Sequence, residues 1–202
     1  MIILKSLNRY LLSLNRYLFS LRIYFLVSFL IFVSGVIGGY YFAQNFSVET
    51  KEVILKIEEI FQPILEMNKI SQILFIFLKN GMTSFLVILG GLIFGIFPVL
   101  SLFSNGEILG ILAYLTFQKF NPAVFFCGIL PHGLIEIFCF LICGAIGLKI
   151  SKTLIDKIFK KEASIKDELD LALEFFLKVI LILLFLAAIL EVLITPEFLK
   201  FF

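Results

Sequence analysis

Residues 128–147 read GILPHGLIEIFCFLICGAIG, and this apolar stretch contains the only histidine of the chain, His132. Glu136 follows one helical turn later and is the only charged side chain between Lys119 and Lys149. A carboxylate in the hydrocarbon of a bilayer costs about 2.5–3.5 kcal/mol on insertion scales. We therefore expect Glu136 to face protein or a water-filled cavity rather than lipid.

Small and polar residues of this stretch recur at steps of three or four, so on a helix they share one face. They are Gly128, His132, Glu136, Cys139, Cys143 and Gly147. The opposite face is bulky and apolar, which is typical of a transmembrane helix that packs its small face against neighbouring helices. Pro131 lacks a backbone donor, so the helix is expected to kink or to begin a new segment there.

Several roles are open for His132. It can be a hydrogen-bonded residue of the bundle core, a group that moves protons or binds a ligand, or a metal ligand together with Glu136, Cys139 and Cys143. Ligands strung along successive turns of one helix are too spread out to close on one ion, and the chain has no second histidine. Other helices would have to supply ligands, so the sequence alone predicts no metal site and no cofactor.

The composition places the chain among membrane proteins. Hydrophobic residues make up 61% of its 202 residues, against about 45–50% in soluble proteins. Its mean hydropathy is +1.10. The net charge of +2 gives no reason to expect a nucleic-acid partner. The cysteines all lie in one apolar segment without zinc-finger spacing, and they are most simply small packing residues.

The N-terminal segment contains a near-exact heptad repeat, LNRYLLS at 7–13 and LNRYLFS at 14–20. It carries Lys5, Arg9, Arg16 and Arg22 and no acidic residue. Residues 1–22 are therefore predicted to form an amphipathic helix that lies against anionic lipid. The alternative is a positively charged flank that only sets the orientation of the first span.

Charge-free apolar runs predict an all-α, polytopic membrane helix bundle that forms a single domain over residues 1–202. A span needs about 20 apolar residues. The predicted spans are 23–43, 82–103, 107–121, 122–148 and 171–194. Residues 49–69 are predicted to form an amphipathic helix outside the bilayer that ends near Pro63. Residues Ser104 to Glu107 are predicted to form a turn. The apolar stretch within 107–131 is short for a full span. The alternative to a span is a partly re-entrant segment.

The positive-inside rule orients these spans. The N-terminal flank and the loop at 149–169 are rich in Lys and Arg, whereas residues 49–69 have fewer positive and more acidic residues. Five spans that start inside place the N-terminus and the 149–169 loop in the cytoplasm and the C-terminus outside. A wholly re-entrant 107–131 would put the Lys-rich loop outside, which favours five spans.

Glycines mark the faces where helices are expected to approach closely. Gly35 and Gly39 form a GxxxG motif in the first span. The other predicted packing glycines are Gly91, Gly95, Gly128 and Gly147.

The sequence lacks the common motifs of catalytic and phosphate-binding sites. His132 and Glu136 have the wrong spacing for the HExxH zinc motif, and the chain has neither GxSxG nor a P-loop. We therefore expect that the protein is not an enzyme. An intramembrane enzyme is kept as a further class, which requires a metal or a polar cavity open to one side.

Several short blocks resemble the stage II sporulation protein M family, an integral-membrane family that is also found in bacteria and archaea that do not sporulate. The blocks are Asn80 before the second span, Gly90-Gly91 with Gly95, Asn105-Gly106 with Gly110, and Leu130-Pro131-His132-Gly133 with Glu136. The resemblance covers roughly residues 20–195. It departs where the family often has paired asparagines and this chain has Lys79-Asn80.

The resemblance implies a scaffold in the cell membrane, which in spore formers recruits peptidoglycan-degrading partners. We therefore expect a multi-pass membrane scaffold or assembly protein without catalysis. The alternative is a small transporter or channel that uses His132 and Glu136. The expected partners are the lipid bilayer, other membrane or cell-envelope proteins and a second copy of the chain. The predicted polar core and family motif are Asn80, Asn105, Gly106, Glu107, Gly110, Pro131, His132, Gly133 and Glu136.

Overall fold

The computed structural model describes residues 15–120, 122–160 and 164–200, and all regular structure within them is helical. The predicted N-terminal amphipathic helix lies mostly outside these residues; its described part, residues 15–20, is helical. The elements that follow are α2 (Arg22–Asn45), α3 (Ser47–Leu65), α4 (Lys69–Leu89), η1 (Gly90–Leu92), α5 (Ile96–Lys119), α6 (Pro122–Lys160), α7 (Ile165–Phe175), η2 (Phe176–Ile180), α8 (Leu181–Leu193) and α9 (Thr195–Leu199).

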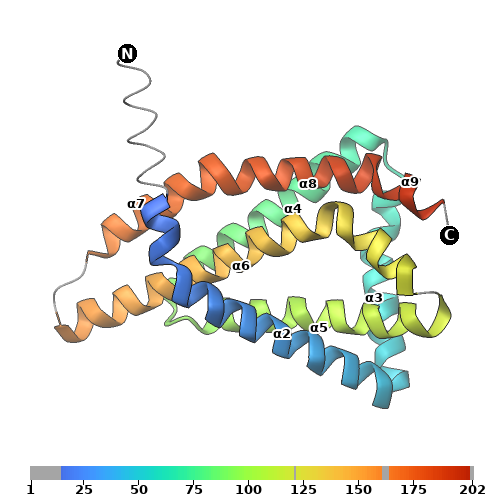
Figure 1. Cartoon of the computed structure of the whole chain (residues 1–202), viewed down its shortest axis with the longest axis horizontal. Helices are drawn as coiled ribbons and strands as arrows, with labels where there is room; N and C mark the ends of the chain where they lie inside the picture. The colour runs from blue at the N-terminus through green and yellow to red at the C-terminus, as the bar shows by residue number, and fades with distance from the viewer. Residues whose placement is uncertain (1–14, 121, 161–163, 201–202) are drawn as a thin grey trace.

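Five segments of the described chain are long and apolar enough to cross a bilayer. They are Arg22–Asn45, Lys69–Leu92, Ile96–Lys119, Pro131–Phe159 and Ile165–Phe198. Successive segments run in alternating directions along the long axis of the molecule (Figure 1). The predicted fold class, an all-α membrane bundle with five spans, is confirmed.

Helix α3 lies across one end of the bundle, roughly at right angles to the long helices (Figure 1). It joins the end of α2 to the start of α4, and Pro63 lies inside its last turn. Its sequence mixes Lys and Glu with apolar residues at helical spacing. That pattern suits a helix at a membrane surface rather than one that crosses it.

The second and third spans are not where the sequence predicted them. The spans at 82–103 and 107–121 are replaced by 69–92 and 96–119. Residues 79–81 lie inside α4, although their polar Lys79-Asn80 pair resembles a break, and the Asn80 side chain donates a hydrogen bond to Glu136 on α6. Residues 104–107 are not a turn but lie inside α5, where the Asn105 side-chain amide donates to the Ser101 carbonyl one turn earlier.

The real break between these spans lies at residues 90–95. A short 3₁₀ turn, Gly90–Leu92, ends α4, and the chain then passes through positive φ at Phe94 (51°) and Gly95 (75°). Gly95 tolerates this conformation because it has no Cβ. The break lets the chain reverse direction and enter α5.

The remaining boundaries also shift. The fourth and fifth spans, predicted at 122–148 and 171–194, lie at 131–159 and 165–198, whereas the first extends the predicted 23–43 only slightly, to 22–45. Helix α6 is continuous through Pro131, so no new segment begins there. Its N-terminal part bends away from the rest of the helix (Figure 1). The charges at the other end of α6 extend that helix to Lys160, because i,i+4 pairs such as Lys152 with Asp156 form on its surface.

Helices α2 and α5 pack backbone against backbone and run in the same direction. A Cβ added at Gly39 would overlap the backbone carbonyl of Glu107, and one added at Gly35 would overlap that of Phe103. Helix α5 makes the same kind of contact in return, because its Gly106 and Gly110 lie against backbone carbonyls of α2. Each helix thus presents a GxxxG face to the other, and the small residues permit the close approach.

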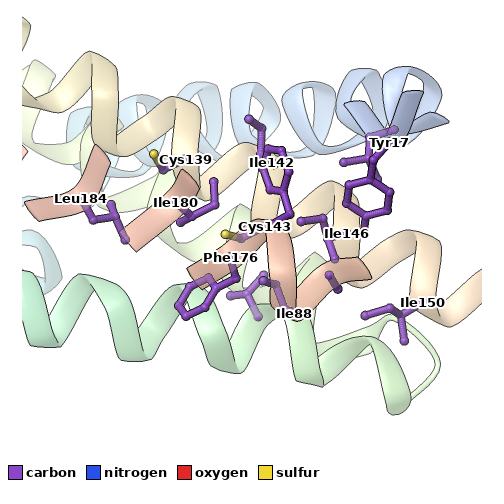
Figure 2. Packing of buried hydrophobic residues seen from close by; sticks show 14 residues of the cluster. Tyr17, Ile88, Cys139, Ile142, Cys143, Ile146, Ile150, Phe176, Ile180 and Leu184 are labelled. Carbon is purple, nitrogen blue, oxygen red and sulfur yellow. The ribbon is translucent and has the colours of Figure 1, made fainter. Parts of the chain in front are cut away.

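Helix α6 forms the centre of the main apolar core (Figure 2). Its face of Cys139, Ile142, Cys143, Ile146 and Ile150 is buried against α4, η2 and α8. The cysteines Cys139 and Cys143 are fully buried free thiols and act as small packing residues.

A buried ion pair closes the end of the bundle opposite α3. The Lys149 ammonium lies 2.9 Å from a Glu168 carboxylate oxygen, and the Tyr17 hydroxyl donates to the other oxygen at 3.1 Å. Burial, together with the negative charge of Glu168, raises the pKa of Tyr17, which keeps the hydroxyl protonated as a donor. Through these contacts the N-terminal helical residues pack against α6 and α7.

We predict opposite effects for two adjacent glycines of α2. Gly39→Ala forces a methyl into the α5 backbone and should destabilise the protein by about 1–3 kcal/mol. Gly38→Ala meets only the tip of the Phe103 ring at 3.6 Å, an ordinary contact. This control gains helix propensity and should be neutral or stabilising by about 0.5–1 kcal/mol. Thermal unfolding in detergent measures both, and equal shifts in the two variants would contradict the packing.

Candidate functional site

Polar side chains from four helices meet inside the apolar bundle. His132 and Glu136 come from α6, Asn80 from α4, Glu191 from α8 and Thr195 from α9. Helix α6 brings its two residues onto one face because they are one turn apart. The cluster lies toward the end of the bundle that carries α9.

Asn80 and Glu136 form a direct bond between α4 and α6. The Asn80 side-chain amide donates to the Glu136 carboxylate at 2.6 Å, and both residues are partly buried. This bond satisfies a carboxylate that would otherwise face hydrocarbon, and it explains why a polar Lys-Asn pair is tolerated in the middle of α4.

His132 is held by Thr195. The Nδ1 atom of the imidazole lies 2.9 Å from the Thr195 hydroxyl oxygen. That hydroxyl donates its proton to the Leu190 backbone carbonyl at 3.3 Å, so toward the ring it acts as acceptor. The tautomer that satisfies both contacts is the one in which His132 Nδ1 carries the proton and Nε2 keeps its lone pair.

Glu191 completes the cluster. A ring nitrogen of His132 and one carboxylate oxygen each of Glu136 and Glu191 lie within 4.8 Å of one another, and all three residues are partly buried. Lys79 of α4 interacts electrostatically with both carboxyl groups. The set combines two acids, one base and one imidazole within a membrane-spanning bundle.

A cavity of about 230 Å³ opens beside these residues. Its polar lining comprises Lys79, Asn80, Thr83, Ser84, Asn105 and Glu136, and its apolar lining comprises Phe32, Ile108, Leu109, Leu112, Ile137, Phe140 and Leu184. Asn105 is exposed and faces this cavity from α5. The cavity is large enough for several water molecules or a small polar solute.

The remaining residues of the predicted family motif are not members of the polar cluster. Gly106 and Gly110 pack against α2, and the Glu107 backbone lies against Gly35 and Gly39, so this block serves helix packing. Pro131 and Gly133 flank His132 on α6, and Gly133 is buried.

Three of the remaining predicted packing glycines lie at close contacts or at the chain reversal. A Cβ on Gly91 would overlap the Gly147 carbonyl, so α6 and η1 touch through these two residues. Gly95 takes the positive φ that starts α5. Gly128 is half-buried in the first part of α6.

Sequence reasoning missed three members of the cluster. They are Glu191, Thr195 and Lys79, none of which the sequence pattern assigned to a site. A usable signal was present for Glu191, because an acid in the most apolar helix of the chain needs a partner at the same depth.

Comparison with known proteins places this arrangement in a family. The sequence model of the family described as Stage II sporulation protein M matches residues 28–196. The chain belongs to the stage II sporulation protein M family. The match includes every residue of the polar cluster and of the paired GxxxG faces, and it confirms the resemblance drawn from the short sequence blocks.

Among curated relatives, an uncharacterized protein of Methanocaldococcus jannaschii is 35% identical over 126 residues, which is 59% of this chain and 68% of that protein. No solved structure matches the chain.

We predict that the size and polarity of residue 136 set the stability of the cluster. Glu136→Gln keeps an oxygen that accepts from Asn80 and should unfold close to the wild-type temperature. Glu136→Leu leaves the Asn80 amide buried without that partner and should cost about 1–3 kcal/mol. Both are measured by thermal unfolding in detergent that contains a chelator, so that bound metal does not contribute. Equal stability of the Leu variant and the wild type would contradict a structural role for the bond.

Proposed function

We propose that the protein is a multi-pass scaffold or assembly protein of the cell membrane that performs no catalytic step. The observation that carries this proposal is that polar residues of the family motif pair with other helices of the same bundle. Asn80 binds Glu136, and His132 binds Thr195. Family membership supports the same reading, because in spore formers the resemblance implies a scaffold that recruits cell-wall enzymes.

Rigid packing also supports a scaffold. Helices α2 and α5 touch backbone to backbone at their glycines, and interhelical hydrogen bonds hold α6 against α4 and α9. A bundle held in one arrangement presents constant surfaces to its partners. Those partners are proposed to be other membrane or cell-envelope proteins, with a second copy of the chain as an additional candidate.

The proposal includes an orientation. The C-terminal end of α6 and the start of α7, which carry Lys149, Lys152, Lys157 and Lys166, lie at the end of the bundle opposite α3 and α9 (Figure 1). By the positive-inside rule, this basic end faces the cytoplasm, and α3 and the C-terminal end face outward.

We predict that a cysteine placed on each side reports this orientation. In a Cys127→Ser background, Glu52→Cys should react with a membrane-impermeant maleimide on intact cells, because it is exposed on α3. Lys157→Cys, exposed near the end of α6, should react only after lysis. The buried Cys139 and Cys143 provide an internal control for background labelling. The opposite pattern would reverse the proposed orientation.

We predict that the protein purifies from its native membrane with specific envelope proteins, and that their capture depends on the intact bundle. Gly39→Ala, which disturbs the α2–α5 contact, should reduce capture, whereas Gly38→Ala should retain it. Co-purified proteins are quantified by mass spectrometry after cross-linking. Equal capture by both variants, or no enriched protein over a mock purification, would count against a scaffold.

The alternative is a small transporter or channel, and the cavity lined by Lys79, Asn80, Asn105 and Glu136 is the observation that favours it. The same purified protein distinguishes the two functions. Ion or proton flux into proteoliposomes that is lost in Glu136→Gln would support transport, and absence of flux across a broad ion panel would support the scaffold.

A further inference from the structure

The cluster of His132, Glu136 and Glu191 places two carboxyl groups close together and near the Lys79 ammonium. With both carboxyl groups ionised, their two negative charges would exceed the one positive charge of the Lys79 ammonium, which acts on both of them. In the interior of a membrane bundle a residual charge is costly, so it is balanced by a proton or a bound cation.

The geometry favours a cation because the imidazole is prepared as a ligand. When the Thr195 hydroxyl donates a hydrogen bond to the Leu190 carbonyl, it accepts one from His132 Nδ1–H, and this tautomer leaves the lone pair on His132 Nε2. A hydrogen bond from the second ring nitrogen to an oxygen acceptor is the arrangement that fixes the tautomer and orientation of metal-binding histidines. No such arrangement is needed for two carboxyl groups that share a proton.

We infer that His132, Glu136 and Glu191 form a binding site for a divalent transition-metal cation that links α6 to α8. The ligand atoms lie within 4.8 Å of one another. Ligands at about 2.1 Å from one Zn²⁺ lie about 3.4 Å apart in a tetrahedron, so small rotations of the carboxylate ends close the site. This inference does not depend on the proposed scaffold function.

The donor set selects the class of ion. Carboxylate oxygens suit Mn²⁺ and other hard cations, and imidazole nitrogen suits Zn²⁺, Fe²⁺ and later metals. One nitrogen and two oxygens therefore fit Zn²⁺ or Mn²⁺ better than Na⁺ or K⁺. Three protein ligands leave a coordination position for water, and the cavity beside Glu136 provides space for it.

Lys79 gives the site a distinctive property. Its positive charge opposes a cation at the two carboxylates, so it weakens binding while it stabilises the metal-free cluster. Removing this charge should strengthen metal binding, whereas removing a ligand should weaken it. Two substitutions in one cluster thus change the affinity in opposite directions, which a purely structural polar cluster would not do.

The experiment uses the full chain, purified in detergent, stripped with a chelator and exchanged into chelator-free buffer. MnCl₂ and ZnCl₂ are each titrated, and bound metal is measured by equilibrium dialysis with elemental analysis. MnCl₂ is the primary probe because it binds thiols weakly, which limits interference from Cys127. We expect one ion per chain and a rise in the unfolding temperature with added metal.

Four variants test the assignment. Glu191→Gln should weaken binding by at least about tenfold, and Thr195→Val, which releases the imidazole, by about 10–100-fold. Lys79→Gln should bind more tightly than the wild type. Glu174→Gln is the control, because Glu174 lies on α7 in an exposed pair with Lys178 away from the cluster, and it should bind like the wild type.

The inference fails if the wild type binds neither ion, which would leave a shared proton as the balancing charge. It also fails if Glu191→Gln binds as tightly as the wild type, because the ion would then lie elsewhere. Where Glu191→Gln does not fold, Lys79→Gln decides the question, since unchanged or weaker binding in that variant overturns the site.

Discussion

The pairing of polar groups in a medium that contains no water is the constraint on which this structure depends. Glu136 lies in the middle of an apolar helix, and its carboxylate has Asn80 of α4 as a hydrogen-bond donor. The cost of leaving such a group in lipid fixes the rotation of α6 about its own axis. That rotation in turn directs Cys139, Cys143 and Ile146 into the core and turns Leu134 and Phe138 outward.

A second constraint is the distance between helix backbones. The contact of α2 with α5 uses glycines on both sides, and η1 meets α6 through Gly91 and Gly147. Hydrophobic attraction between side chains contributes little inside a bilayer, where lipid tails are equally apolar. Dispersion contacts between closely packed backbones and a small number of polar bonds therefore hold this bundle together.

Much of the fold could be predicted from the sequence, and the failures have physical causes. The charge-free run before Val48 located α2, and the spacing of Gly35 and Gly39 identified the face that meets α5. The second and third spans were misplaced because Lys79-Asn80 and Asn105-Gly106 read locally as breaks. In the bundle, Asn80 finds Glu136 and Gly106 finds the α2 backbone, and neither partner is visible from local pattern. The true reversal at Phe94-Gly95 is a backbone conformation without a strong polar signal.

The candidate site was also predicted only in part, because local sequence does not show which distant helices come into contact. His132 and Glu136 lie on one helix, so periodicity alone puts them together. Glu191 and Thr195 reach them through the packing of α8 and α9 on α6, which depends on the whole arrangement. The short blocks shared with the family pointed to α4, α5 and α6 but contained no residue of α8.

The glycine contact between α2 and α5 has a mechanical consequence. The glycines bring the two backbones into contact, and side chains such as Tyr40 and Tyr114 pack beside that contact, so the two helices are expected to move together. The cavity is lined by Phe32 of α2 and residues of α5, and by residues of α4, α6 and α8. A shift of the α2–α5 pair against the other three spans would therefore change the volume of that cavity, in addition to any change in the rotamers of the lining side chains.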